Sequence, residues 1–518
     1  MSAIITDQLR VLNAKNFVAA ATSTTSSYYT FVGLPNASNY DANWDSVPPA
    51  PKDSFDEQND YWDTMIALKK ILSSDVRQVV RKVTWTTGTI YDMYRHDINR
   101  TKVSVPSNST NLYSANYYVV NSDYRVYICL YNGVDPENPS GKPSLDEPTF
   151  TDLEPRSAGD SEDGYIWKYL FTIKPSELVK FDSTNFIPVP SDWETNSDYS
   201  AVRNNALTSG QIKIVTVTNR GVGLGTASRT YTRVPIYGDG AGAECTITVN
   251  ADSKVGSVIV TNGGSGYTYG TIDLVSGTVP TGSSSPVFDV IIPPQNGHGY
   301  DIYRELGAYR VLVYSRIEND NENPDFITGN QIARVGIVQN PLSYNSDSVL
   351  NESKASSLSA LKLVGTGYST ANFIADSLIS QTIGVGSTAV GRVVSYDKNT
   401  GVLKYWQDRT LVGFNSDGSK NPDTLYGFKL HRFTAFPETG GSLTITASGV
   451  SGLGIDTSFT GVSTTINNRK YYLGQTFFNG TSNPEVEKYS GNIIYVDNRP
   501  SITRSSNQKE DIKVILQF

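Results

Sequence analysis

The sequence predicts a mainly β protein of the α+β class, with several domains built from antiparallel sheets or sandwiches and a few short N-terminal helices. Its 518 residues exceed the length of one ordinary domain. Charged residues make up only 18% of the chain, which has 43 glycines and 32 tyrosines. This composition is typical of short strands joined by glycine, asparagine and serine turns, and it differs from that of coiled coils or disordered chains.

The expected helices lie near the N-terminus. Asp7 precedes an irregular apolar face that extends to Phe17 and could dock a short helix on the body of the protein. A second helix is expected to begin near Ser54. Its apolar stripe consists of Tyr61, Met65, Leu68 and Leu72. These positions follow helical spacing, and the carboxylates just before them favour the positive end of a helix dipole.

From Val79 onward, short apolar runs alternate with turn residues, as they do in β-strands. The expected strands are 79–85, 117–120, 124–130, 165–173, 231–237, 244–249, 271–274, 391–396, 402–406, 493–496 and 512–518. Asn132-Gly133 is an expected turn, and 397–401 is the expected loop of a hairpin.

Residues 206–299 carry an internal near-repeat. Residues 217–224 and 260–267 both begin with Val-Thr-Asn and continue into a glycine-rich turn, which predicts one small β-module built by duplication. A second β-rich stretch follows, opened by Gly365-Thr366-Gly367-Tyr368. We therefore expect five parts, namely an N-terminal framework at 1–205, an inserted module at 206–299, framework strands at 300–345, a second inserted module at 346–486, and C-terminal framework strands at 487–518.

Charge and hydropathy argue against several classes of partner. The net charge of −8 is unfavourable for a general nucleic-acid-binding surface. No apolar run reaches the ~18–20 residues of a membrane helix, so no membrane insertion is expected. Asp7, Arg10 and Lys15 make the N-terminus unlike a secretory signal. Cys129 and Cys245 alone form no disulfide framework, which suits a protein made in a reducing cytoplasm.

The residues give little support for an enzyme, a metal site or a bound cofactor. The glycine motifs 221–225 and 238–242 precede expected strands, whereas a phosphate cradle needs a helix after the turn. The acidic segment 318–325 could hold calcium, but it lacks the glycine and final glutamate of an EF-hand loop. The chain has three widely spaced histidines, His96, His298 and His431. We therefore expect no zinc site and no Ser-His-Asp triad.

Tyrosines are the expected contact residues, because this side chain joins a large apolar area to a polar tip. The candidates are Tyr28, Tyr29, Tyr113, Tyr267, Tyr368 and Tyr471. About half of such tyrosines should simply pack inside the fold, since Tyr is intermediate in burial.

Several blocks of the sequence resemble one known family, in the same order. They are Trp44 with 47–54, Trp62 with Met65, 81–85, 159–173, 185–190, 337–342, 490–500 and 510–518. The family is the baseplate wedge protein, gene product eight, of contractile-tailed T-even-type bacteriophages. The likeness covers 1 to about 205, about 300 to 345 and about 487 to 518. The two β-rich stretches between these parts have no matching counterpart and are expected to be insertions.

The resemblance implies a structural virion protein, made in the host cytoplasm, that sits in each wedge of the sixfold tail baseplate. It implies a homodimer that contacts other wedge proteins and takes part in assembly and in the rearrangement that triggers sheath contraction. It implies no catalytic residue and no cofactor. As a hypothesis, rigid domains would turn about glycine-rich joints near 205, 299, 345 and 487.

Two alternatives stay open at this stage. In the first, the inserted modules bind carbohydrate of the host surface, with Tyr267, Tyr269 and Tyr368 as aromatic platforms for sugar faces. In the second, the chain is an enzyme such as a polysaccharide depolymerase. We rank both below the baseplate subunit.

Overall fold

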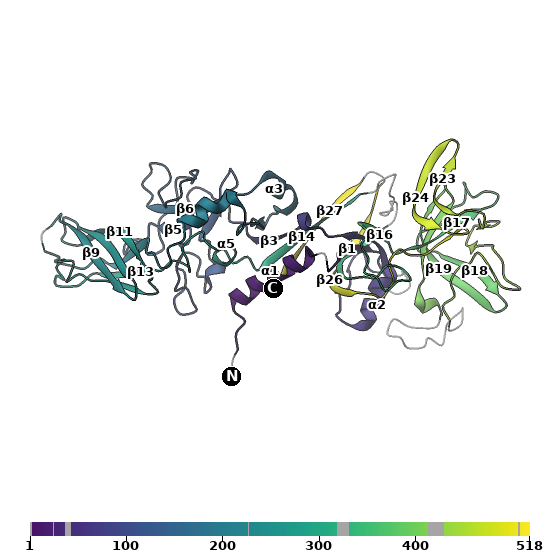
Figure 1. Ribbon diagram of the computed structural model, residues 1–518, viewed down its shortest axis with the longest axis horizontal. Coiled ribbons are helices and arrows are strands. Elements are labelled where there is room, and N and C mark those ends of the chain that lie inside the picture. The colour runs from purple at the N-terminus through teal and green to yellow at the C-terminus, as the bar shows by residue number, and fades with distance from the viewer. Residues whose placement is uncertain are drawn as a thin grey trace. The chain divides into compact units, whose positions relative to one another are not determined.

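The computed structural model describes residues 3–23, 25–36, 43–225, 227–318, 331–412, 429–505 and 508–518. It is mostly β with short helices, which confirms the predicted fold class (Figure 1). The chain forms two compact units. Unit 1 comprises Met1–Val18, Arg77–Leu312 and Ile515–Phe518, and unit 2 comprises Ala19–Val76 and Val313–Val514. The chain changes unit within four elements, α1 (Asp7–Ala21), β3 (Val76–Arg81), β14 (Arg310–Glu318) and β27 (Lys509–Gln517).

Unit 1 holds three short helices and most of the first strands. The helices are α3 (Pro175–Phe181), α4 (Ser200–Asn205) and α5 (Ile302–Glu305). The strands are β4 (Tyr118–Val120), β5 (Arg125–Asn132), β6 (Tyr165–Thr172), β7 (Phe186–Pro188), β8 (Ile214–Asn219), β9 (Thr230–Gly238), β10 (Ala241–Val249), β11 (Val255–Ser265), β12 (Gly270–Ile272) and β13 (Val287–Ile291). The expected strands at 117–120, 124–130 and 165–173 correspond to β4, β5 and β6.

The core of unit 1 is rich in aromatic side chains around the antiparallel sheet β4-β5-β6. The ring of Tyr165 stacks on Trp167 with centroids 5.3 Å apart, and the edge of Tyr91 meets Trp167 at 5.8 Å. Trp193 stacks on Tyr199 at 4.9 Å. These rings are buried, so the aromatic content of this region serves mainly to fill its interior.

Residues 212–292 form a separate hydrophobic cluster within unit 1. It lies among the sheet β11-β10-β9-β12 and the pair β8–β13, drawn in teal in Figure 1. Strand β10 alternates buried and half-buried residues over 243–249, as expected for a sheet with one covered face, and β9 does so on either side of a shift at Thr232 and Arg233. This cluster corresponds closely to the expected module at 206–299.

The two copies of the near-repeat in this module have similar turns. The side chain of Asn219 accepts a hydrogen bond from the N–H of Gly221, and Asn262 does the same for Gly264, at 2.8 and 3.1 Å. Gly221 and Gly264 both have positive φ, and so do the glycines two residues after each of them. The strands around the two turns pair differently, since β8 joins β13 whereas β11 joins β10.

Replacing Gly264 with alanine should destabilise this module by about 1–3 kcal/mol. Its φ is +59°, and an added Cβ would lie 2.5 Å from the carbonyl oxygen of Ala241. Gly242→Ala is the matched control, because Gly242 has φ +82° but no atom closer than 3.9 Å to the added Cβ. Hydrogen exchange in β10 and β11 measures the stability of both variants. An equal effect of the two substitutions would show that the steric clash with Ala241 contributes nothing.

Among its described residues, unit 2 contains one α-helix that lies wholly within it and most of the C-terminal strands. The elements are β1 (Tyr28–Gly33), α2 (Phe55–Thr64), β2 (Met65–Lys70), β15 (Gln331–Gln339), β16 (Lys354–Ser356), β17 (Ser359–Val364), β18 (Leu378–Gly384), β19 (Ser387–Asp397), β20 (Val402–Trp406), β21 (Thr446–Ala447), β22 (Gly454–Ile455), β23 (Gly461–Ile466), β24 (Arg469–Phe477), β25 (Thr481–Ser482) and β26 (Asn492–Thr503). They form a sheet ordered β16-β2-β1-β15-β26, a second sheet centred on β19 and β20, and the isolated pair β23–β24.

The second expected helix is correct at its start and wrong at its end. Ser54 caps α2 by accepting a hydrogen bond from the N–H of Glu57 at 3.3 Å. The helix stops at Thr64, however, and Met65–Lys70 forms strand β2 between β1 and β16. The first four residues of β2 are buried on both faces of the sheet. A short, fully buried strand has no alternation to reveal it, so its apolar residues matched helical spacing by coincidence.

The two ends of each expected insertion lie side by side. In unit 1, a Cβ added to Gly297 would lie 2.3 Å from the carbonyl oxygen of Ala206. In unit 2, the N–H of Asn345 donates to the carboxylate of Glu487 at 2.9 Å. Adjacent ends are what an insertion into a framework requires, and they support the five-part division, which stays a prediction. Of the acidic segment 318–325, residues 319–325 lie outside the described residues.

Candidate interaction surfaces

The six candidate tyrosines do not form one surface. Tyr113 and Tyr267 belong to unit 1, whereas Tyr28, Tyr29, Tyr368 and Tyr471 belong to unit 2. Three of them, Tyr28, Tyr29 and Tyr267, are buried by the chain itself. The other three keep part of their rings exposed, so a contact role stays a prediction for them.

The buried tyrosines serve the interior. Tyr29 lies on β1, in the middle of its sheet, and its hydroxyl donates to the carbonyl oxygen of Glu352 at 2.7 Å. Burial raises the pKa of Tyr29 well above its ordinary value. The hydroxyl of Tyr267 donates to the carbonyl oxygen of Ile236 at 2.8 Å, and its ring fills the space above Gly240, where a Cβ would approach it to 2.4 Å. Rings placed in this way offer no contact area to a partner.

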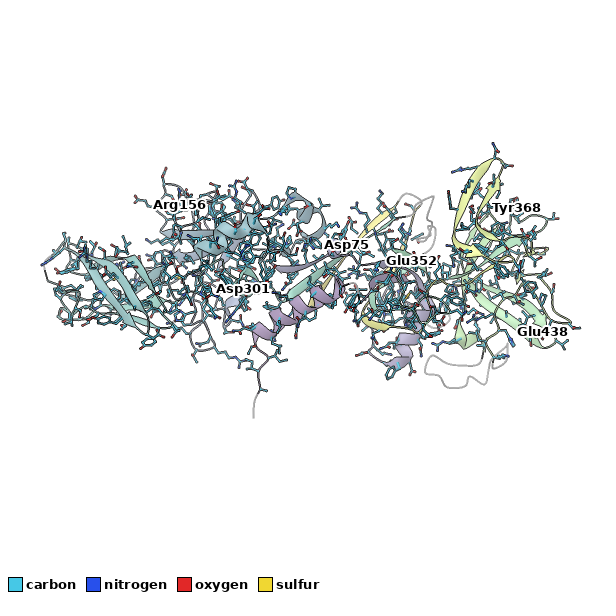
Figure 2. The ribbon with its side chains drawn as sticks, viewed as in Figure 1. Asp75, Arg156, Asp301, Glu352, Tyr368 and Glu438 are labelled. Carbon is cyan, nitrogen blue, oxygen red and sulfur yellow. The ribbon has the colours of Figure 1, made fainter. Side chains whose placement is uncertain are left out.

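The half-exposed tyrosines are held by their own neighbours. The hydroxyl of Tyr113 donates to the carbonyl oxygen of Arg304 at 2.6 Å. Tyr368, labelled in Figure 2, lies 5.8 Å from the ammonium group of Lys362. Tyr471 carries the guanidinium of Arg469 over its ring at 5.2 Å. Each ring is therefore oriented within the chain before any partner arrives.

A groove of about 320 Å³ in unit 2 is a candidate contact surface that the sequence analysis missed. Its apolar lining combines buried residues with exposed ones and comprises Val32, Ile317, Ile332, Val335, Ile502, Ile512 and Val514. Ile502 is 53% exposed, although it lies on the long strand β26. β26 is also the last strand of its sheet, so apolar side chains and a sheet edge occur together here.

Ion pairs give the groove a fixed charged rim. Arg316 donates to both oxygens of Asp511, at 2.7 and 2.9 Å, and the hydroxyl of Tyr314 donates to the first of them at 2.8 Å. The hydrogen bonds from Arg316 lower the pKa of Asp511 to about 2. On the same segment, Glu510 accepts from the buried Arg504 at 2.8 Å. These contacts hold the C-terminal strand in place beside the apolar lining.

The N-terminal helix of unit 1 offers a second apolar surface. On α1, Val11 and Ala14 are buried, while Leu9 and Leu12 are exposed. Ile4 and Ile5, just before the helix, are exposed as well. Apolar residues therefore surround more of this helix than one docked face can cover. That excess is the sequence signal that would have pointed to this surface.

A polar cavity of about 240 Å³ in unit 1 is lined by Tyr94, His96, Tyr113, Arg304 and Glu305, among others. Both oxygens of the Glu305 carboxylate are engaged, one by the Nδ1 atom of His298 at 2.6 Å and the other by the N–H of Gly299 at 2.7 Å. His96 accepts a hydrogen bond from the N–H of Ile292 at 3.2 Å, and burial lowers its pKa. The acid and base groups at this cavity are thus committed to structural bonds.

Neither Cys129 nor Cys245 is placed as a reactive thiol. Both thiols are buried, and burial raises the pKa of Cys245 to about 12 and that of Cys129 well above its ordinary value. Among the described residues, no group of three or more His, Cys, Asp or Glu side chains is placed to hold a metal ion. Within the same residues, no helix has the length and apolar character needed to span a membrane.

Comparisons with known proteins agree with the resemblance seen in the sequence. Residues 3–154 match the family model described as bacteriophage T4 Gp8. The chain is also 26% identical over 220 residues to the baseplate wedge protein gp8 of Enterobacteria phage T4. That match covers 38% of this chain and 63% of the relative, so it spans a little under two thirds of the relative's length. Residues 3–154 of this chain are therefore similar to the Gp8 family of bacteriophage baseplate wedge proteins.

Proposed function

We propose that the chain is a structural subunit of a baseplate wedge in a contractile phage tail. The single observation that carries the proposal is the match of residues 3–154 to the Gp8 family. The relative is a baseplate wedge protein by name, and this chain acts in the same way, by burying surface against other proteins.

The geometry supports an assembly role over a catalytic one. Unit 2 presents the apolar groove beside the edge strand β26, and unit 1 presents the exposed apolar residues of α1. The polar cavity of unit 1 has its carboxylate and imidazole groups engaged in structural bonds. Exposed apolar surface next to fixed ion pairs suits stable protein contacts, which bury about 2,000 Å² or more when obligate.

The finer parts of the proposal concern partners and movement. A second copy of the chain and neighbouring wedge proteins are the expected partners. On contraction, rigid parts would turn about the joints near 205, 299, 345 and 487. The joints near 205 and 299 lie close together, and so do those near 345 and 487. This supports the proposed movement, because each inserted module is then attached to the framework at a single place.

The carbohydrate-binding alternative is not favoured. Of the three tyrosines expected to form sugar platforms, Tyr267 is buried and Tyr368 is half-buried. Tyr269 is 61% exposed, but the buried ring of Tyr267 cannot form a sugar-binding platform with it. A single exposed aromatic side chain is ordinary on a protein surface.

The test is genetic and structural. An amber codon in the gene, in a phage grown on a non-suppressing host, should give particles without complete baseplates, and a suppressing host should restore them. Electron microscopy reports the baseplates, and mass spectrometry of purified wild-type tails reports the chain. Complete baseplates under the amber codon, or tails that lack the chain, would overturn the proposal. Light scattering of the purified chain tests the homodimer separately.

A further inference from the structure

Strands β23 and β24 form a two-stranded hairpin that pairs with no other strand among the described residues. They are joined by Asn467 and Asn468, both with positive φ, as a two-residue hairpin turn requires. In Figure 1 this ribbon extends away from its neighbours β17 and β19 in unit 2. We call residues 461–477 the β23–β24 arm.

The base of the β23–β24 arm is anchored in the interior of unit 2. Leu473 and Phe477 are buried in one hydrophobic cluster with Ala360 and Val402. The buried side chain of Gln475 donates to the carbonyl oxygen of Leu358 at 2.6 Å. The base therefore positions the arm, and substitutions beyond it need not disturb the core.

The outer part of the arm comprises residues 462–472. None of these residues is buried. Gly461 and Gly474, at φ +139° and +79°, lie where the pairing register shifts, and such bulges redirect a hairpin relative to its base. A two-stranded hairpin without a covered face is marginally stable in water, so this part of the arm gains most from a partner.

The outer part of the arm is basic in an acidic protein. Arg469 and Lys470 are exposed and lie over the rings of Tyr471 and Tyr472 at 5.2 and 4.6 Å. Neither cation takes part in the ion pairs formed among the described residues. No acidic residue occurs between 457 and 484, whereas the whole chain carries a net charge of −8. Stacking on the tyrosines orients both cations and leaves their charge unneutralised.

We propose that the β23–β24 arm docks on an acidic surface of a neighbouring baseplate subunit, with Arg469 and Lys470 facing its carboxylates and Tyr471 and Tyr472 supplying the apolar contact. This inference rests on the proposed function, which places other proteins next to the chain. A second copy is a poorer acceptor, because many of its own carboxylates are paired, such as Asp376 and Asp408 with Arg392, and Asp511 with Arg316.

Zero-length coupling in purified intact tails gives the first test. A carbodiimide couples the side-chain amine of Lys470 to a carboxyl group as an amide. The water lost in this condensation converts the carbodiimide to a urea. Mass spectrometry should find Lys470 linked to an Asp or Glu of a different protein. A link only to this chain, or no link while other lysines are coupled, would overturn the inference.

Charge reversal gives the second test. The amount of the double variant Arg469→Glu/Lys470→Glu incorporated into tails should be about tenfold lower than that of wild type, because like charges then face each other. Lys398→Glu/Lys429→Glu is the matched control, since both lysines are exposed residues of unit 2 and the net charge change is the same. Arg469→Lys/Lys470→Arg should assemble as wild type does.

The controls separate the two proposals. Hydrogen exchange at Leu473–Phe477 should match wild type in every variant, which confirms that the arm's base is folded. Equal incorporation of the reversed variant and the control pair would refute the docking role and leave the baseplate assignment intact. Absence of the wild-type chain from tails would instead refute the baseplate assignment.

Discussion

Replacing Arg334 with alanine should destabilise unit 2 by about 3–5 kcal/mol, because it removes a large buried side chain together with the hydrogen bonds that its guanidinium donates. Arg334 is 1% exposed on β15. Its guanidinium donates to the side chains of Asn498 at 2.9 Å, Asn36 at 3.1 Å and Thr64. Truncation would leave these acceptors without their donor and open a void the size of the side chain.

Two aromatic rings enclose the same guanidinium, which lies 5.2 Å from the ring of Trp44 and 4.8 Å from that of Tyr61. Burial lowers the pKa of Arg334 to about 10, so the group stays charged at neutral pH. Arg334 thus ties the segment before α2, the end of α2 and strand β26 to the sheet.

Hydrogen exchange measured by mass spectrometry checks the prediction. We expect faster exchange in β15 and β26 and an unchanged exchange rate in unit 1. Arg334→Lys keeps the charge but loses the forked geometry, so it should lose an intermediate amount of stability. Unchanged protection of β26 in Arg334→Ala would show that the guanidinium does not hold that strand.

Replacing Trp193 with alanine should have a comparable effect in unit 1, about 3–5 kcal/mol. The side chain is fully buried and stacks on Tyr199, and its indole N–H donates to the carbonyl oxygen of Tyr300 at 3.0 Å. The ring of Phe171 meets it edge-on at 6.1 Å. The substitution would therefore leave a large cavity and an unsatisfied carbonyl group near the polar cavity.

Trp193→Phe separates packing from hydrogen bonding, because it keeps a ring against Tyr199 and removes only the donor. We expect it to cost about 1–2 kcal/mol. Denaturant unfolding combined with hydrogen exchange in β6 and α4 measures both variants. An equal loss of protection in Trp193→Phe and Trp193→Ala would show that the hydrogen bond, and not the packing, accounts for the effect.

The sequence predicted the local features of this protein well. The mainly β class, the start of α2 near Ser54, and the glycine turns of the near-repeat all depend on residues close together in the chain. The hairpin loop at 397–401 was predicted in the same way, and Gly401 there has φ +69°. The family resemblance came from ordered blocks of sequence, and the family match over residues 3–154 confirms it.

The candidate site was predicted poorly, and the reason is physical. Whether a tyrosine is buried depends on strands that are distant in sequence, as with Tyr29 between β2 and β15. The same holds for the groove, whose lining joins Val32 to Ile512. Composition can show that contact residues are abundant, but it cannot show which of them the chain covers itself.

By itself, then, the sequence determined the strand-rich architecture, the turn chemistry and the family resemblance, because short-range sterics and ordered motifs specify them. Only the tertiary structure decided that Met65–Lys70 is a strand, that Tyr267 fills the space above glycines, and that Arg469 and Lys470 end on the β23–β24 arm. Burial and pairing are properties of surfaces brought together by folding, and no local stretch of sequence contains them.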